Sequence, residues 1–342
     1  MGRKSRRRHG NKASIRWCLS ICAIVVMMAV GMSFARYMEG RMNVKIENAG
    51  KQMTNHSNDG DAAQVYMNGQ WYRRKNVETL LVIGIDDTGS ITTSDSYNNA
   101  NQADFLALMI RDEETGENRA IHLNRDTMTD ITMLGVTGKA VGVEHAQLAL
   151  AYNYGSGQHD SSRNTLSAVS NLLYGMDIDN YITVTMDAVT VMNDWAGGVM
   201  VEIADDMTSV DSALVAGEEV KLTGEQALAY VRARKGLDDS TNINRMERQR
   251  QYAAAWMEQA QDKLNDPEAV SELMVQIEDY YYSNCTAEEL AEIAGWMSGE
   301  SFVEFCELPG KSVQGEQYIE YYADDEEIQQ IVLDMFYMPV EN

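Results

Sequence analysis

This chain of 342 residues lacks the sequence signatures of several common catalytic designs. Its five histidines show no spacing typical of metal ligands, which gives zinc hydrolysis no support. No Gly-x-Ser-x-Gly element, the nucleophile turn of α/β-hydrolases, occurs. Gly310-Lys-Ser312 resembles the end of a phosphate-binding loop, but Phe305 stands where that motif requires its first glycine. None of these three designs is therefore expected.

Cysteines and basic residues are scarce over most of the chain. Of four cysteines, only Cys285 and Cys306 lie beyond the N-terminal apolar run, and their spacing fits either a disulfide or two separate thiols. Residues 1–41 hold nine Lys or Arg and one Glu, a net charge of +8, so a total of −24 leaves −32 for the rest. Nucleic acid repels a domain of that sign, and no nucleic-acid partner is expected.

The N-terminus is basic and is followed by a long apolar run. Residues 1–16 contain seven Lys or Arg and no acid, and residues 17–35 carry no charge. Nineteen apolar residues can cross a bilayer as a helix, and the basic flank is expected to stay in the cytoplasm. We therefore predict a single-pass protein of the cell membrane with its large C-terminal domain outside the cell. Ser33-Phe34-Ala35 has the form of a signal-peptidase site, so cleavage and secretion are the alternative.

Beyond this segment the pattern predicts a linker and then one domain. Residues 36–75 are polar and weakly patterned, which is typical of a linker. From residue 76 onward short apolar runs alternate with amphipathic stretches. This predicts an α/β fold: a single αβα-layered domain around a mainly buried mixed sheet, preceded by one transmembrane helix. The domain is expected to span residues 76–338, with the part from about 266 packed onto it, and residues 339–342 form a tail.

Periodicity gives the expected elements of this domain. The predicted strands are 78–85, 105–110, 120–123, 181–186, 199–203 and 302–308. The predicted helices are 147–154, 163–174, 187–195, 267–282, 286–297 and 324–336. Thr223-Gly-Glu-Gln226 has the form of a capping box and predicts a further helix start.

Five arginines lie within 19 residues of this strongly acidic domain: Arg232, Arg234, Arg245, Arg248 and Arg250. A guanidinium is a permanent cation whose fork of donors fits phosphate oxygens in pairs, so the grouping favours a polyanion site. The capped helix would carry Arg232 and Arg234 in its last turns. A second helix starting near Arg245 would place Arg245, Arg248 and Gln249 on one face. Surface ion pairs with the abundant carboxylates are the alternative.

Acidic residues flank two predicted strands. Ile83-Gly-Ile-Asp-Asp87 follows the first strand and Gln102-Ala-Asp104 precedes the second, so neighbouring strands can bring Asp86 and Asp104 together. Paired carboxylates beside a phosphate are the usual protein ligands of Mg²⁺. The alternative is that the first pair consists of ordinary turn residues.

Asn124-Arg-Asp-Thr127 follows the third predicted strand. Arg125 can join a phosphate clamp with Asp126 orienting it as a buried partner. A purely structural ion pair between these two residues is the alternative.

Taken in order, these motifs resemble the LytR-CpsA-Psr family over about residues 76–338. The most specific part is Leu-Thr-Gly-Glu-Gln-Ala-Leu-Ala-Tyr-Val-Arg-Ala-Arg at 222–234, followed by Arg-Met-Glu-Arg-Gln-Arg at 245–250. Members of that family are membrane-anchored phosphotransferases of Gram-positive cell envelopes. They move a glycopolymer, such as a teichoic acid or capsule chain, from a polyprenyl pyrophosphate carrier onto peptidoglycan. The resemblance implies the same reaction and the same partners here.

By position, the resemblance implies Asp86 and Asp104 as ligands of Mg²⁺ or Mn²⁺. It implies a pyrophosphate clamp made of Arg125, Arg232, Arg234 and Arg245, with Gln249 assisting. Asp104 or Asp126 would accept the proton of the attacking hydroxyl. A non-catalytic envelope protein that binds pyrophosphate lipids or acts in cell-wall signalling is the alternative, and an extracellular adhesin or scaffold is a third interpretation.

The chain departs from the family pattern in three motifs. The family commonly has Arg-Ser-Asp where this chain has Gln102-Ala-Asp104, so one expected cation is absent. Pro-Arg-Asp becomes Asn124-Arg-Asp126, and an acid commonly found three residues before the last clamp arginine becomes Asn242. Asp238 or Asp239 is the candidate substitute for that acid.

Overall fold

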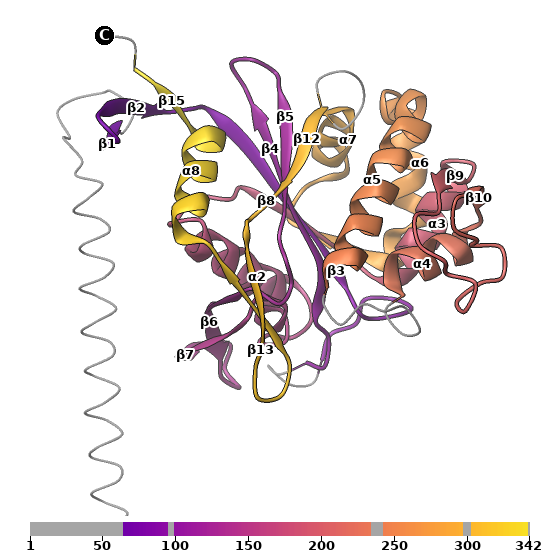
Figure 1. Cartoon of the computed structure of the whole chain (residues 1–342), viewed down its shortest axis with the longest axis horizontal. Helices are drawn as coiled ribbons and strands as arrows, with labels where there is room; N and C mark the ends of the chain where they lie inside the picture. The colour runs from indigo at the N-terminus through magenta and orange to yellow at the C-terminus, as the bar shows by residue number, and fades with distance from the viewer. Residues whose placement is uncertain (1–63, 95–98, 234–241, 297–301, 341–342) are drawn as a thin grey trace, which may run out of the picture. The chain divides into compact units, whose positions relative to one another are not determined.

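A computed structural model describes residues 64–94, 99–233, 242–296 and 302–340 of the chain (Figure 1). The predicted cytoplasmic tail and transmembrane segment lie outside the described residues, as does Arg234. Within the described ranges, every helix is too short or too polar to cross a bilayer. The described residues belong to two compact units, one holding 64–73 with 339–340 and the other Arg74–Met338.

The first unit contains a β-hairpin of β1 (Gln64–Met67) and β2 (Gln70–Arg74). Asn68 and Gly69 both have positive φ, 51° and 84°, as the tight two-residue turn requires. Val340 N donates to Trp71 O at 2.8 Å, so the end of the chain returns to this hairpin. The range predicted as a linker therefore includes two strands.

The second unit is built on a six-stranded sheet with the order β11-β8-β3-β4-β5-β12. β3 runs parallel to β8 and antiparallel to β4, whereas β5 runs antiparallel to β4 and parallel to β12. The predicted α/β fold around a mixed sheet is therefore confirmed. The strands are β3 (Val77–Ile85), β4 (Ala103–Asp112), β5 (Asn118–His122), β8 (Asn180–Val184), β11 (Tyr281–Ser283) and β12 (Phe302–Glu307).

The apolar run of β3 places this strand inside the sheet with both faces covered. Leu80 and Leu81 point to opposite faces, and they are 3% and 0% exposed. On one face, Leu80 packs with Ile293 and Trp296 of α7 (Ala287–Trp296). In Figure 1, α8 (Asp325–Phe336) lies to the left of the sheet, and α5 and α6 lie to its right.

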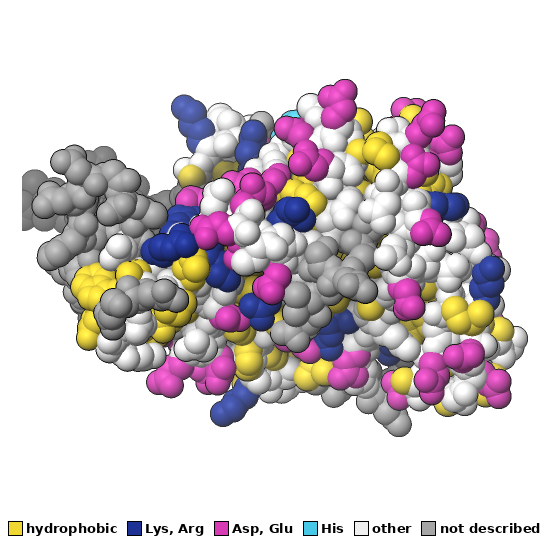
Figure 2. Space-filling model, turned by 90° about the horizontal axis from the view of Figure 1, so that it is seen from above, with side chains coloured by type: hydrophobic (Ala, Val, Ile, Leu, Met, Phe, Trp, Pro, Cys, Tyr) yellow, Lys and Arg dark blue, Asp and Glu magenta, His cyan; other side chains and the backbone are white. Residues whose placement is uncertain are grey.

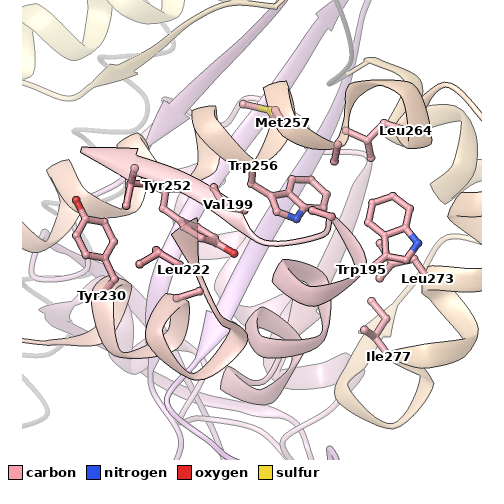
Figure 3. Packing of buried hydrophobic residues seen from close by; sticks show 14 of the residues in the cluster. Trp195, Val199, Leu222, Tyr230, Tyr252, Trp256, Met257, Leu264, Leu273 and Ile277 are labelled. Atoms are coloured by element: carbon pink, nitrogen blue, oxygen red, sulfur yellow. The ribbon is translucent and has the colours of Figure 1, made fainter. Parts of the chain in front are cut away.

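A second hydrophobic core joins the helices that carry the arginines (Figure 3). Its helices are α3 (Met186–Trp195), α4 (Gly224–Arg232), α5 (Ile243–Leu264) and α6 (Pro267–Gln276), covered by the antiparallel pair β9 (Val199–Glu202) and β10 (Glu219–Leu222). Tyr230 of α4 is fully buried, and the Trp195 and Trp256 rings lie 6.2 Å apart. This core fixes α4 against α5.

Two predicted elements were wrong in part. The helix expected at 147–154 is instead the end of strand β7 (Ala140–Gln147) and one 3₁₀ turn, η1 (Leu148–Ala151). β7 pairs with β6 (Met128–Leu134) up to Gln147, which lies opposite Met128, so the first residue of the expected helix belongs to the strand. The helix expected at 267–282 ends at Gln276, and η2 (Glu278–Tyr280) and β11 follow it.

Other elements lie close to their predicted positions or were not foreseen. Helix α2 (His159–Leu172) begins four residues before the predicted 163–174. Strand β8 ends before Thr185, the N-cap of α3, where a strand to 186 was expected. The hairpin of β13 (Gly310–Gln314) and β14 (Ile319–Ala323) and the last strand, β15 (Tyr337–Pro339), were not predicted. Cys285 is a free thiol and is therefore not paired with Cys306.

Candidate functional site

Arg125 lies on the loop that follows β5, and its side chain is 8% exposed. Its guanidinium has an acceptor at each Nη atom and a carboxylate beside Nε. Nη1 forms an ion pair with Asp104, Nη2 donates to Gln102 Oε1, and Nε lies 3.4 Å from Asp126 Oδ1. Burial makes these partners necessary, because an uncompensated cation in the protein interior is strongly unfavourable.

Asp104, at the start of β4, is shared by two arginines. Its Oδ1 accepts from Arg125, and its Oδ2 lies 2.9 Å from Nη1 of Arg245 on α5. Arg245 is 1% exposed, and it is the largest of the fully buried side chains in the described part of the chain. One strand-end carboxylate thus holds a loop arginine and a helix arginine at one point.

The predicted capping box at the start of α4 is present, with Thr223 Oγ1 accepting from Gln226 N. The other end of α4 is held by α5. Arg248 donates through Nε to Tyr230 O at 3.1 Å and through Nη2 to Ala233 O. These carbonyls lie at the C-terminal end of α4, where the helix supplies no further backbone N–H groups to bind them. Arg248 therefore acts as a C-terminal cap for α4.

Arg232 and Gln249 line the same small cavity as Asp104 and Arg245. The cavity has a volume of about 70 Å³. The rest of its lining is mostly apolar and comes from β3, β4, β8, α3 and α4: Gly84, Ile85, Phe105, Val184, Thr185, Met186, Val189, Leu228 and Val231. Cations and an apolar wall thus face one space. Arg232 itself is exposed to solvent.

Two oxygen atoms of the lining residues are buried without a hydrogen-bond partner in the described part of the chain. They are Gln249 Oε1 and Thr185 Oγ1. Gln249 uses its Nε2 to donate to Val231 O at 3.2 Å. Because an unsatisfied buried polar group is costly, a hydrogen-bond donor that reached these two oxygen atoms would be favoured.

Gln102 connects Asp86 to this cluster. Asp86 Oδ1 accepts from Gln102 N at 2.5 Å, and Asp86 N donates to Gln102 O at 3.0 Å. The neighbouring strands β3 and β4 do therefore bring the predicted acidic pair into one region. Asp87 instead accepts from Thr88 N and from Asn101 Nδ2, as a turn residue does.

The predicted metal pair fits a divalent ion only in part. Asp86 is exposed and offers a carboxylate, whereas both oxygens of Asp104 accept from guanidinium groups. Nowhere in the described ranges do three or more His, Cys, Asp or Glu side chains gather into a metal site made of protein ligands alone. Mg²⁺ is commonly held by one or two carboxylates plus substrate phosphates, so the pair suits an ion that arrives with phosphate.

The loop carrying Arg125 is tied to three other elements. Gln147 of β7 donates from Nε2 to Asp126 Oδ1 at 3.0 Å and to Ile319 O at 2.8 Å. Tyr321 N of β14 donates to Asp126 O at 2.9 Å. Asn242, the N-cap position of α5, donates to Asn124 Oδ1 at 3.3 Å. The two departures at 124 and 242 therefore contact each other.

One buried histidine beside the site carries no sequence signal. His122, 2% exposed at the end of β5, has its ring 4.9 Å from that of Phe105. Burial, together with the charges of Arg250 and Arg245, lowers the pKa of His122 to about 3. His122 is therefore neutral at ordinary pH and adds no positive charge to the arginines.

The structure thus brings Asp104, Arg125, Asp126 and Arg245 into direct contact and places Arg232 and Gln249 on the adjoining cavity. Arg234, Asp238 and Asp239 lie outside the described residues. Gln147 and His122 are additional residues that the sequence motifs did not single out.

These features define the class of protein: an α/β domain with a buried arginine cluster suited to an anionic group beside an apolar cavity. The chain belongs to the LytR_cpsA_psr family, whose model matches residues 41–335. The resemblance inferred from the motifs is therefore confirmed.

Two curated relatives carry the same name. The protein named polyisoprenyl-teichoic acid–peptidoglycan teichoic acid transferase TagU from Halalkalibacterium halodurans is 30% identical over 182 residues, which is 53% of this chain and 53% of the relative. The chain thus spans about half the length of that relative. The TagU protein of Bacillus subtilis is 23% identical over 77% of this chain and 78% of its own length.

Solved structures share the fold. TagV of Bacillus subtilis superposes with a TM-score of 0.59 at 20% identity, covering 76% of this chain and 97% of TagV. A structure described as TagT bound to LIIa-WTA gives a TM-score of 0.58 at 17% identity, covering 76% of this chain and 89% of TagT. At such identities the likeness establishes the fold.

Proposed function

We propose that this protein is a phosphotransferase that moves a glycopolymer from a polyprenyl pyrophosphate carrier onto peptidoglycan. The observation that carries the proposal is the pair of buried arginines on Asp104 beside a cavity with an apolar wall. Such a site suits an amphiphile with a phosphate head and a hydrocarbon tail. Family membership and the TagU name of the relatives support the same reaction.

The chemistry needs positioning and charge stabilisation more than a dedicated nucleophile. A hydroxyl of the acceptor attacks the phosphorus that is linked to the polymer. A new P–O bond forms, the P–O bond to the carrier phosphate breaks, and polyprenyl monophosphate leaves. The clamp arginines Arg125, Arg232, Arg234 and Arg245 stabilise the negative charge on the leaving phosphate. Asp104 or Asp126 takes the proton of the hydroxyl.

The metal part of the proposal rests on Asp86 and Asp104. Together they would hold Mg²⁺ or Mn²⁺ beside the phosphates, where the ion would neutralise charge. Both oxygens of Asp104 accept from arginines in the described arrangement. A phosphate that draws Arg245 away from Asp104 frees a carboxylate oxygen. Metal and pyrophosphate are therefore expected to bind together.

Transfer is tested with the full-length protein in detergent, a polyprenyl-pyrophosphate-linked saccharide and a peptidoglycan fragment. Mass spectrometry should detect both the sugar phosphodiester and the released polyprenyl monophosphate. Loss of the Arg125 guanidinium in Arg125→Ala should lower the rate about 10²- to 10³-fold. Arg163→Ala, at an exposed position on α2, is the control. Tight lipid binding without any turnover would instead favour the non-catalytic binding protein.

Coupled metal binding is tested by electron paramagnetic resonance of Mn²⁺ with the same protein, with and without inorganic pyrophosphate. Pyrophosphate should increase Mn²⁺ binding beyond what its own complex with Mn²⁺ accounts for. Asp86→Asn and Asp104→Asn should lose this increase, and Asp87→Asn, in the adjacent turn, should keep it. Tight Mn²⁺ binding without pyrophosphate would contradict the coupling.

A further inference from the structure

Gln102 connects the acidic and the basic halves of the site. Its backbone N and O pair with Asp86, at 2.5 Å to Oδ1 and 3.0 Å to N. Its side-chain Oε1 accepts from Nη2 of Arg125. A single residue thus links the exposed carboxylate at the end of β3 to the buried guanidinium on the loop after β5.

The contact of Gln102 completes the set of acceptors around Arg125. Asp104 meets Nη1, Asp126 lies 3.4 Å from Nε, and the Gln102 amide oxygen takes Nη2. A guanidinium is planar with donors in fixed directions, so acceptors at both Nη atoms restrict its orientation. Without the acceptor at Nη2, only the bond from Nη1 to Asp104 would remain of these two hydrogen bonds.

The acceptor at Nη2 differs in charge from the other two. Hydrogen bonds between a cation and a carboxylate are roughly twice as strong as bonds between neutral groups, and an amide oxygen lies below the carboxylate in strength. Nη2 is therefore the edge of Arg125 that exchanges its partner for a phosphate oxygen most readily. The carboxylates of Asp104 and Asp126 hold the rest of the group during that exchange.

The absence of an arginine at position 102 has two interpretations with opposite consequences. If the missing arginine is simply a lost cation, Gln102 weakens the site, and an arginine at this position would restore phosphate binding. If Gln102 instead serves as the hydrogen-bond acceptor for Arg125, it is needed. An arginine at this position has no acceptor atom, would repel Arg125 and would compete with it for Asp104. The observed contact between Oε1 and Nη2 favours the second interpretation.

We infer that Gln102 is a positioning residue whose amide oxygen orients Arg125 for a phosphate oxygen of the substrate. The inference rests on the proposed function, since Arg125 is the residue that would touch the phosphate. It makes Gln102 an adaptation of this site in which a neutral acceptor takes the place of an extra cation.

The test compares Gln102→Arg, Gln102→Leu and Gln102→Glu with the parent, all as full-length protein in detergent. Both kcat and KM for transfer are measured, and the affinity for inorganic pyrophosphate is measured by calorimetry. Gln261→Arg, at an exposed position on α5, adds the same charge away from the site and is the matched control. Thermal unfolding verifies that each variant folds like the parent.

Loss of the acceptor should lower kcat about 10- to 100-fold in Gln102→Arg and Gln102→Leu, as misplacement of a catalytic group by a fraction of an ångström to an ångström does. Gln102→Glu keeps an acceptor for Nη2 and should recover most of kcat, with a higher KM because its charge repels the phosphate. Gln102→Arg should bind pyrophosphate no more tightly than the parent. A structural role alone would not produce this split between kcat and KM.

Faster transfer or tighter pyrophosphate binding by Gln102→Arg would overturn the inference, as would an unchanged kcat in Gln102→Leu. These outcomes are distinct from failure of the proposed function. If the parent binds pyrophosphate but transfers nothing, the proposed function fails, and the pyrophosphate affinities of the variants still decide on Gln102. A parent that binds no pyrophosphate would refute both.

Discussion

The arginines of the site differ in how deeply they are buried, and burial separates their roles. Arg245 is 1% exposed and pairs with Asp104, whereas Arg232 is exposed at the end of α4. A buried arginine contributes to folding through its partner as well as to ligand binding. An exposed arginine does not contribute to folding in this way. Replacing one or the other therefore has different consequences.

Arg245→Ala is expected to destabilise the protein by about 3–5 kcal/mol, because it leaves the Asp104 carboxylate with one cation fewer in a buried place. Arg232→Lys should leave stability unchanged and still slow transfer, since an ammonium keeps the charge but cannot form a two-pronged contact with phosphate. Denaturant unfolding and transfer rates are measured on both variants. Full activity of Arg232→Lys would exclude Arg232 from the clamp.

His122 should make stability depend on pH. Its pKa is about 3 in the folded protein and rises to the ordinary value for histidine on unfolding, so the unfolded chain binds more protons between these values. The contribution of His122 to the free energy of unfolding is therefore fully present above pH 6.5 and is lost as the pH falls towards 3. A full proton of difference corresponds to about 1.4 kcal/mol per pH unit.

The measurement is the free energy of unfolding of the parent and of His122→Asn from pH 7 to 4, with His145→Asn, at an exposed position, as control. His122→Asn should show a flatter pH dependence than the parent in this range, and the control should follow the parent. Equal slopes in all three proteins would show that the pKa of His122 does not change when the protein unfolds.

Sequence reasoning at the level of single residues succeeded where partners are close in the chain. Arg125 and Asp126 were expected as a pair, and the structure places the Arg125 Nε 3.4 Å from Asp126 Oδ1. Gln147 was not expected, because its contacts with Asp126 and Ile319 span 21 and 172 residues. A neutral side chain with an ordinary sequence neighbourhood gives no signal until the tertiary contacts are known.

At the scale of elements, local signals determined how well each prediction held. The capping box at Thr223 fixed the start of α4, and the i, i+3, i+4 spacing placed Arg245, Arg248 and Gln249 on the buried side of α5. Their shared face did not imply a shared role, since Arg248 binds the end of α4. The direction of a helix face can be predicted from spacing, whereas the partner on that face cannot.

The hairpins of β6–β7 and β13–β14 are among the elements that the sequence did not reveal. β7 is largely exposed, so it has no apolar run that would mark it as a strand. Both hairpins nevertheless reach the loop that carries Arg125, through Gln147 and through Tyr321. Their contribution to the site is to hold the backbone of Asp126, a role that depends on hydrogen bonds and not on hydrophobic pattern.

At the scale of the whole molecule, charge is the dominant property. Beyond residue 41 the chain carries a net charge of −32, and Figure 2 shows acidic side chains spread over the visible face. Such a surface repels a polyanionic glycopolymer at long range. The arginines must therefore act at short range, where burial strengthens their interaction with a phosphate head. A carrier lipid that presents its phosphate directly to the site meets this requirement.

The basic N-terminus and the charge-free run at 17–35 add the membrane to this picture. We expect residues 42–342 outside the cell and the N-terminus in the cytoplasm, since basic flanks are retained on the cytoplasmic side. Protease added to intact protoplasts should digest the large domain, while an epitope tag at the N-terminus stays protected until the membrane is permeabilised. Protection of the large domain in intact protoplasts would rule out this orientation. Recovery of the domain in the medium, without the apolar run, would instead show cleavage after Ala35, and the site would then have to capture its lipid without an anchor of its own.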